Sequence, residues 1–380
     1  MSSVVVIGGG IAGYCAALGA RREGAEITML AKAPGATALY AGAMEVVDDL
    51  DTVLESEPHH PFTRLRLDAV RLASELDTAI PALLLALEKD GLKFEGTWKS
   101  RGLYADIHGL ARPGNLVPAT VVAGELKGLV GRRVSVVGVR EVGDYDAEAA
   151  AQALKDLYNI DAAAEEVSIA DLPAGAALTD LYGRRAPSLS KSRASYVAYP
   201  PGFTNLPDGG FELLATPPSP HGWRLQQAIG LGAVRATVDG LLQVDDGRIV
   251  AVRAGEKTYR APAFVLATGH YIGGGLQKDH STTTHEPLMG LGVFHDGRPA
   301  SALAARLAHV DYLEPAQEFR SGLATDERLR PLDESGHAPY ENLFAAGAVL
   351  GGYDYAGACG FGVPILTGWL AGRFAARVGR

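Results

Sequence analysis

The amino-terminal residues alternate apolar runs with a glycine-rich turn, and this pattern predicts a β-α-β unit. Residues 4–7 form an unbroken apolar run, VVVI, typical of a strand buried on both faces of a parallel sheet. The spacing over residues 11–23 predicts a helix, and residues 25–30 predict a second strand. The chain therefore begins as part of a parallel sheet covered by helices.

Residues 66–91 also have helical spacing, which we expect to be interrupted before Pro81 because a residue before proline disfavours the helical conformation. The region that follows differs in character. Residues 133–139 predict a strand and 146–158 a helix, and a proline-rich stretch, TPPSPHG, closes the region near residue 220. We interpret it as an inserted domain.

From Trp223 onward the alternating pattern resumes. We expect a helix over residues 225–231, a hairpin over 238–255 with Asp246-Gly247 at its turn, and a buried strand in AFVLATG. A further strand ends in NLFAAG, and a closing helix is expected over residues 362–378. These segments return to the first domain.

Composition excludes several classes of function. A formal net charge of −9 without a long Lys/Arg run argues against a nucleic-acid partner. The only cysteines, Cys15 and Cys359, argue against a disulfide framework, an iron-sulfur cluster or a zinc site, so no metal is expected. No secretory signal is visible, which favours the cytoplasm. Residues 355–372 carry no charge, but their five glycines and Pro364 favour a loop entering a buried helix over a membrane span.

Gly8, Gly10 and Gly13 form a G-x-G-x-x-G motif between the first strand and the first helix. In this motif the first glycine permits the tight turn, the second lets the backbone approach a phosphate, and the third lets the helix pack closely on the strand. The N–H groups at the helix start favour an anion. A glycine-rich turn without a ligand is the alternative.

The second strand lacks the acidic residue that holds ribose hydroxyls in dinucleotide sites, since it ends in Leu30-Ala31-Lys32. A hydrogen bond to a charged group contributes about 1.5–3 kcal/mol, so its absence weakens adenosine binding by roughly 10- to 150-fold. Lys32 either meets a phosphate or is a solvated surface lysine.

Two other strands end in small-residue turns, at Leu266-Ala267-Thr268-Gly269 and at residues 342–347. With the opening motif they describe the three chain passes of a flavin-binding Rossmann domain. The glycine-rich start of the last helix, residues 359–363, would stabilise negative charge on a reduced flavin. The candidate cofactor-binding residues are Gly8, Gly10, Ile11, Ala12, Gly13, Lys32, Ala36, Thr37, Gly42, Ala43, Ala267, Thr268, Gly269, Gly347, Gly351, Gly352, Gly360, Phe361, Gly362 and Val363.

Six segments together resemble one known family: ATALYAGAMEV (36–46), TPPSPHGWRLQ, VLATGHYIGGGL, EPLMGL, TDERLRP and NLFAAGAVLGGYDYAGACGFGV. They are similar to the B subunit of anaerobic glycerol-3-phosphate dehydrogenase, within the superfamily of FAD-dependent fumarate reductase and succinate dehydrogenase flavoproteins. The similarity extends over nearly the whole chain and is weakest at residues 144–195.

The resemblance implies an α/β fold, in which a Rossmann-like flavin-binding domain carries an inserted smaller cap domain. The expected flavin-binding segments are residues 1–95, 221–275 and 329–380, and the expected cap segments are residues 96–220 and 276–328. It also implies FMN as the cofactor, with FAD as the alternative, because FMN has no adenosine for an acidic residue to hold. Ala348, where many FAD relatives place Glu, is a second departure from the superfamily.

The activity implied is oxidation of glycerol 3-phosphate to dihydroxyacetone phosphate. Electrons would pass to quinone through a membrane-bound iron-sulfur subunit, beside a catalytic A-type flavoprotein subunit, at the inner face of the cell membrane. Two alternatives stay open: a non-catalytic, flavin-holding or scaffold subunit that docks a catalytic partner, and a free-standing FAD oxidoreductase of another small hydroxy acid.

Oxidation of a secondary alcohol needs a base near the hydroxyl and cations near the phosphate. The catalytic candidates are His270 and Glu286 as bases, and Arg224 and Arg320 as phosphate ligands. Weaker candidates are His108, His221, His285, Arg112, Arg184, Arg185 and Arg193.

Overall fold

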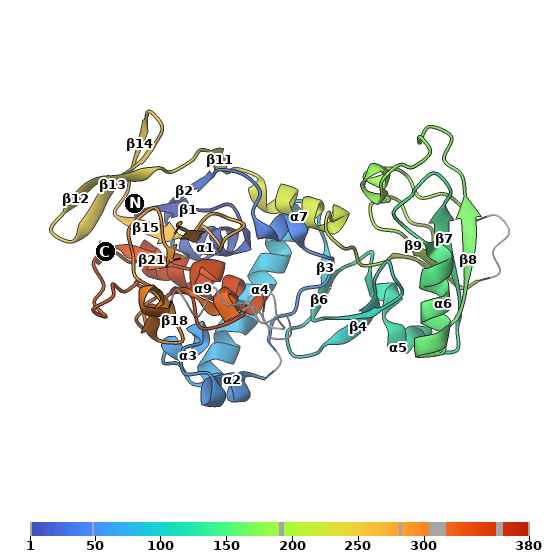
Figure 1. Ribbon diagram of the computed structural model, residues 1–380, viewed down its shortest axis with the longest axis horizontal. Coiled ribbons are helices and arrows are strands. Elements are labelled where there is room, and N and C mark those ends of the chain that lie inside the picture. Colours follow the sequence, from blue (N-terminus) through green and yellow to red (C-terminus); the bar gives the residue numbers. More distant parts are fainter. Residues whose placement is uncertain are drawn as a thin grey trace. The chain divides into compact units, whose positions relative to one another are not determined.

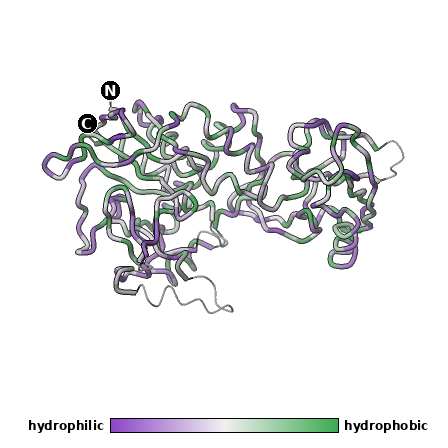
Figure 2. Tube along the Cα trace, turned by 45° about the horizontal axis from the view of Figure 1, so that its top comes forward, coloured by the Kyte–Doolittle hydropathy of each residue, from purple (hydrophilic) through white to green (hydrophobic). Residues whose placement is uncertain are grey.

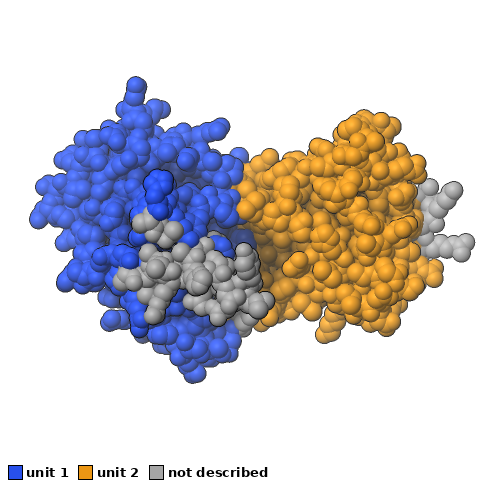
Figure 3. Space-filling model, in the orientation of Figure 1, with its two compact units in different colours: residues 1–36, 46–86, 229–380 blue, residues 37–45, 87–228 orange. Residues whose placement is uncertain are grey.

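The computed structural model describes residues 2–47, 49–189, 194–280, 283–303, 317–354 and 360–378. The chain divides into two compact units (Figure 3). Unit 1 comprises Met1–Ala36, Val46–Ala86 and Ile229–Arg380, and unit 2 comprises Thr37–Glu45 and Leu87–Ala228. The described residues between 276 and 328 lie in unit 1 with the amino-terminal segment, whereas we expected them with the cap. Hydrophobic stretches lie inside each unit and the outlying loops are mostly hydrophilic (Figure 2).

Unit 1 is built on a parallel sheet with the strand order β11-β2-β1-β15-β21 (Figure 1). The strands are β1 (Ser3–Ile7), β2 (Glu26–Ala31), β11 (Val234–Arg235), β15 (Ala263–Leu266) and β21 (Leu343–Ala345). In register, Ile7 lies beside Leu266, and Leu266 lies beside Ala345. The carboxyl ends of these strands meet at one edge, where ligands bind in sheets of this type. The predicted α/β fold with a Rossmann-like sheet is confirmed.

Helices α1 (Ile11–Arg22) and α9 (Gly362–Ala376) pack so closely that their backbones are in contact. A Cβ atom at Gly368 would lie 2.4 Å from the Ala12 carbonyl oxygen, and one at Gly372 would lie 1.9 Å from that of Ala16. Only glycine permits so close an approach. The two helices predicted at residues 11–23 and 362–378 are thus confirmed, and they pack against each other beside the sheet.

Helix α4 (Ala69–Lys89) continues through Pro81, so the predicted interruption before that residue is wrong. The proline removes one hydrogen bond to the preceding turn. The helix nevertheless continues because Leu72, Leu76 and Leu83 are fully buried along one face. Burial of this apolar face outweighs the local cost of the proline.

Unit 1 also contains short helices and antiparallel strands. The ribbon β12-β13-β14 projects from the body of the unit (Figure 1), and the turn at Asp246-Gly247 has the positive φ angles of a tight hairpin, 43° and 68°. The predicted hairpin is confirmed. The elements are α2 (Leu50–Ser56), α3 (Pro61–Arg64), β12 (Gly240–Asp245), β13 (Arg248–Ala254), β14 (Lys257–Arg260), β16 (Gln277–Lys278), β17 (Thr284–His285), β18 (Val293–His295), β19 (Arg298–Pro299) and β20 (Gly322–Leu323).

Unit 2 holds a second parallel sheet, of order β10-β9-β7-β8, packed against α6. The strand predicted at 133–139 and the helix predicted at 146–158 are confirmed as β7 and α6. The elements are β3 (Phe94–Gly96), β4 (Gly102–Ala105), β5 (Ala111–Gly114), β6 (Leu116–Pro118), α5 (Leu126–Leu129), β7 (Arg133–Val139), α6 (Ala147–Tyr158), β8 (Asp161–Val167), β9 (Tyr196–Tyr199) and β10 (Gly210–Glu212). Helix α7 (Pro220–Gly230) follows them in the chain.

Within the described ranges, no helix combines the length and apolar character that crossing a bilayer requires. Of the uncharged stretch 355–372, residues 355–359 lie outside those ranges and Gly362 begins α9. Among all the residues that the structure describes, no cluster of three or more His, Cys, Asp or Glu side chains is placed to hold a metal ion.

Candidate functional site

The turn between β1 and α1 has the geometry that its glycines predict. Gly8 has a φ of 129°, and a Cβ atom there would lie 2.0 Å from the Ala267 carbonyl oxygen. A Cβ atom at Gly13 would lie 2.1 Å from the Gly8 carbonyl oxygen. Gly10 precedes α1 with extended backbone; no side chain caps the helix, and its first turn contains no acidic residue. The turn therefore leaves the helix start suited to an anionic ligand.

Residues that follow β15 and β21 meet this turn at the same edge. The Thr268 hydroxyl oxygen is buried, and no described residue is hydrogen-bonded to it. Gly347 packs on α1, since a Cβ there would lie 2.5 Å from the Cβ of Ala12, and its N–H donates to the Thr367 hydroxyl. A buried hydroxyl that lacks a partner costs free energy unless a ligand or water satisfies it. The edge thus offers a ligand an uncapped helix start and a buried hydroxyl, and a flavin bound here stays a prediction.

The end of β2 brings no carboxylate to this edge. Ala31 is its last residue and faces the glycine turn, because a Cβ at Gly9 would lie 2.5 Å from that of Ala31. Lys32 is exposed to solvent. An adenosine ribose at this position would therefore lack its usual acidic partner.

The start of α9 is shaped by contact with the chain at Val46. Phe361 is the N-cap residue, without a side-chain cap, and Val363 is buried. A Cβ at Gly362 would lie 1.8 Å from the Val46 carbonyl oxygen, so glycine is required here for packing. Gly360 is half-buried, and Cys359 lies outside the described residues. A role of these residues in flavin binding stays a prediction.

The remaining cofactor candidates are dispersed. Ile11, Ala12 and Ala267 are buried around the turn, Gly269 follows Thr268, and Ala36 is exposed. Three others lie in unit 2, where Thr37 is buried, Gly42 packs on the His221 ring and Ala43 packs on Gly114. Gly351 and Gly352 line a hollow in unit 1, described below.

Two catalytic candidates, His270 and Arg320, lie close together in unit 1. His270 is buried, and its Nε2 atom lies 2.8 Å from the Ser321 carbonyl oxygen, so this nitrogen carries the proton. Arg320 donates to Glu57 at 3.0 Å and to Asp296 at 3.3 Å. Burial by itself lowers the pKa of Arg320, but these two carboxylates raise it overall. Both side chains are thus engaged with the protein.

Glu286, also in unit 1, caps a turn. Its carboxylate accepts the N–H groups of Leu288 at 3.0 Å and Met289 at 2.7 Å. Burial raises the pKa of Glu286 although these hydrogen bonds oppose the rise. A raised pKa suits a general base, but the hydrogen bonds hold the carboxylate on its own turn.

Arg224 lies in unit 2 and belongs to a buried ion pair. It donates to Glu212 at 2.6 Å and to the Phe203 carbonyl at 2.7 Å. Glu212 also accepts from the Thr120 hydroxyl at 2.6 Å and the Gly202 N–H at 2.8 Å. These contacts satisfy Arg224 without a substrate phosphate.

The weaker candidates are placed similarly. Arg112 pairs with Asp106, Arg184 pairs with Asp171, and the buried His221 donates from Nε2 to the Leu213 carbonyl. His108 is exposed, as is His285, while Arg185 is exposed and bridges to Thr204 through its backbone. Arg193 lies outside the described residues.

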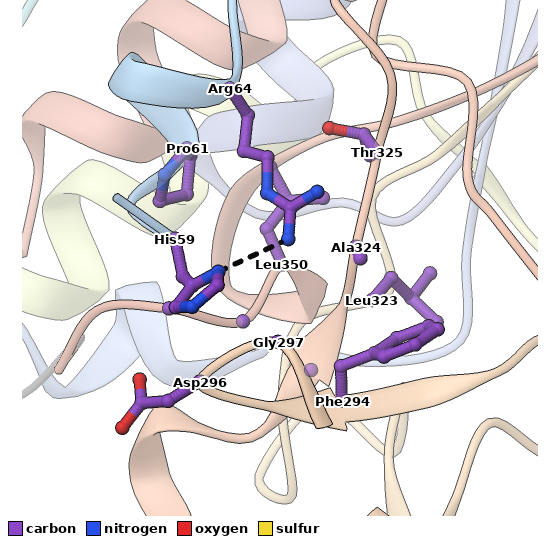
Figure 4. Close-up of a pocket in the computed structure, with 13 residues that line it drawn as sticks. His59, Pro61, Arg64, Phe294, Asp296, Gly297, Leu323, Ala324, Thr325 and Leu350 are labelled. Carbon is purple, nitrogen blue, oxygen red and sulfur yellow. Dashed lines mark hydrogen bonds between the residues drawn. The ribbon is translucent and has the colours of Figure 1, made fainter. Parts of the chain in front are cut away.

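Sequence reasoning did not find a hollow in unit 1 that His59, Arg64 and Asp296 line together with residues 322–325 and 350–352 (Figure 4). Its empty space, open solvent included, is about 300 Å³, and the space that water-sized groups can occupy is about 10 Å³, room for one water molecule. Nothing in the sequence marks His59 or Arg64, because they belong to no motif and, apart from Pro61, the other lining residues lie more than 200 positions further along the chain.

The chain matches the family described as "FAD binding domain" over residues 3–216 and 227–361. It is 28% identical to the B subunit of an anaerobic glycerol-3-phosphate dehydrogenase from Yersinia pseudotuberculosis, with 96% of this chain and 95% of that protein covered. It is also 28% identical to the B subunit of a probable anaerobic glycerol-3-phosphate dehydrogenase from Halobacterium salinarum, over 99% of this chain and 98% of that protein. The resemblance seen in the sequence is confirmed.

Among solved structures, similarity extends to a 3-ketosteroid-Δ4-(5α)-dehydrogenase from Rhodococcus jostii RHA1, with 16% identity, a TM-score of 0.42, and 99% of this chain and 97% of that one covered. An open conformation of a flavocytochrome c3 fumarate reductase has 13% identity and a TM-score of 0.46, with 99% of this chain and 78% of that one covered.

Proposed function

Because the chain belongs to the FAD binding domain family and is similar over nearly its whole length to B subunits of anaerobic glycerol-3-phosphate dehydrogenases, we propose that it is the flavoprotein subunit of such a complex. Its cofactor is a flavin, and the family match supports FAD and gives no support to FMN, which the sequence analysis expected first. The names of the relatives from Yersinia and Halobacterium support the substrate, glycerol 3-phosphate, and its place in a complex. The reaction oxidises the secondary alcohol to the ketone of dihydroxyacetone phosphate.

The observation that carries the proposal is the sheet edge at which the β1-α1 turn, Thr268 and Gly347 meet. Gly8 and Gly13 would shape the turn so that backbone N–H groups near Gly10 meet the cofactor phosphates, and the Thr268 hydroxyl, buried without a described partner, would donate to the bound group. A flavin bound there supplies an acceptor for the hydride that leaves the alcohol carbon.

In the complex, we infer that electrons pass on to quinone through a membrane-bound iron-sulfur subunit, beside an A-type flavoprotein subunit. The chain is then cytoplasmic and attached to the inner face of the cell membrane through these partners. The names of the relatives support a multisubunit enzyme; the partners and the acceptor come from the family resemblance.

A second function, a flavin-holding subunit that does not catalyse, is favoured by one observation. Each of the four catalytic candidates is already hydrogen-bonded to a protein group; they are His270, Glu286, Arg224 and Arg320. A base or phosphate ligand that is already satisfied has to exchange partners before it acts on substrate.

Anaerobic titration of the FAD-loaded full chain distinguishes the two functions. We expect glycerol 3-phosphate to bleach the absorbance of the oxidised flavin, because the alcohol donates its hydride to the bound cofactor. Glycerol, which lacks the phosphate, is the matched control and should leave the flavin oxidised. A flavin that stays yellow with glycerol 3-phosphate but bleaches with dithionite would assign the chain to the non-catalytic function.

A further inference from the structure

The hollow in unit 1 contains an arginine that no carboxylate of the described residues neutralises. Across those ranges, the Arg64 guanidinium has a single hydrogen-bond partner, Nδ1 of His59, at 3.3 Å. Its side chain is half-buried, and burial, together with the like charge of Arg66, lowers the pKa of Arg64. A partly desolvated cation with unsatisfied donors is favourable to an anionic ligand.

The surroundings do not cancel this charge. Asp296 lines the same hollow, but it pairs with Arg320 at 3.3 Å. Figure 4 shows its carboxylate directed away from Arg64, while the Arg64 guanidinium extends into the hollow between His59 and Thr325. The Asp296 carboxylate therefore neutralises Arg320 and not Arg64.

The size of the hollow limits what binds there. The hollow has about 10 Å³ of space for water-sized groups, and its 300 Å³ of empty space includes open solvent. Pockets that enclose drug-sized ligands are typically about 300–1,000 Å³, so a dinucleotide does not fit inside this one. A phosphate group is larger than one water molecule, so it would contact the guanidinium from the open side of the hollow, with a short carbon chain directed toward solvent.

We propose that Arg64, with Thr325 beside it, binds the phosphate group of a small phosphate monoester in this hollow, and that glycerol 3-phosphate is that ligand. The identity of the ligand rests on the function proposed above, whereas the anion site rests on the geometry alone. Guanidinium presents several N–H donors in one plane and grips two phosphate oxygens at once, and the threonine hydroxyl offers a further donor. Inorganic phosphate presents the same chemistry.

The test is isothermal titration of the full chain with glycerol 3-phosphate, inorganic phosphate and glycerol. Arg64→Gln should weaken binding of both phosphates by at least about 10-fold, since it removes charge-assisted hydrogen bonds. Arg64→Lys, which keeps the charge but loses the planar fork, should fall between Arg64→Gln and the unchanged chain. Arg71→Gln is the matched control: Arg71 is 75% exposed and lies 3.9 Å from Asp68, so its loss should change affinity by less than about 2-fold.

Circular dichroism should show the same fold for all three variants. Equal affinity of the Arg64→Gln variant and the unchanged chain would overturn the site, as would failure of both phosphates to bind the unchanged chain. Binding of inorganic phosphate alone would overturn the substrate assignment. If both phosphates bind through Arg64 while the flavin stays oxidised, the site stands and the proposed oxidation fails. If glycerol 3-phosphate bleaches the flavin but substitution of Arg64 leaves the affinity for both phosphates unchanged, the proposed oxidation stands and the proposed site is wrong.

Discussion

Replacing Arg224 by alanine should destabilise unit 2 by about 3–5 kcal/mol, the range found when one partner of a buried ion pair is removed. The Glu212 carboxylate has no exposed side-chain surface, and without Arg224 its hydrogen bonds within the described residues come from Thr120 and the Gly202 N–H. The free energy of unfolding from urea titration measures the effect. Arg133→Ala removes an exposed pair in the same unit, 62% exposed on each side, and should cost at most about 1 kcal/mol.

The same pair gives the stability of the chain a pH dependence. Burial by itself raises the pKa of Glu212, but His221 and Arg224 outweigh it and hold the pKa below the ordinary 4.5. A carboxyl group with a lowered folded-state pKa contributes stability above its unfolded value, and this contribution is lost as the pH falls through the lowered pKa. The unchanged chain should therefore lose more stability than Arg224→Ala as the pH falls below 4.5. If the unchanged chain and Arg224→Ala lose equal stability as the pH falls, and the substitution has a small effect at neutral pH, Arg224 is available to bind a ligand.

Ala31→Glu should tighten FAD binding by roughly 10- to 150-fold, because it restores a carboxylate where the adenosine ribose is expected. Ala31 ends β2 and faces Gly9 of the glycine turn, which places the new side chain beside the cofactor edge. Fluorescence titration of the flavin-free chain with FAD measures the change.

FMN is the matched control ligand for Ala31→Glu, since it has no adenosine to meet the carboxylate. Its affinity should remain within about 2-fold of that of the unchanged chain, a difference well below one hydrogen bond. An unchanged affinity for FAD would show that no ribose lies at the end of β2, and would return FMN to consideration.

The sheet of unit 1 was predictable because the sequence pattern of its strands is compatible with only one kind of secondary structure. The apolar runs of β1, β15 and β21 are too short for helices and are each followed by small residues, which fixes a buried parallel strand with a turn at its carboxyl end. The β1-α1 turn was predictable for the same reason, since Gly8 and Gly13 are needed wherever two backbones approach this closely.

Other features depend on contacts that sequence patterns do not reveal. Strand β8, DAAAEEV, is half-exposed and lacks β-branched residues until its end, so its pairing with β7 decides its conformation. Pro81 stays in a helix because of tertiary packing. Whether an arginine is satisfied is also a tertiary property. Arg224 pairs with Glu212, 12 residues away, and Arg320 with Glu57, 263 residues away, whereas Arg64 has no carboxylate partner among the described residues.

The central claim is that this chain holds a flavin at the edge formed by β1, β15 and β21. Its most direct test is mass spectrometry of the flavin that heat releases from the natively purified full chain. We expect the mass of FAD, in about equimolar amount, and flavin affinity weaker by roughly 10-fold when Thr268→Val replaces the buried hydroxyl with a methyl group of the same shape. A chain purified without any flavin, and unable to take up FAD or FMN on titration, would contradict it.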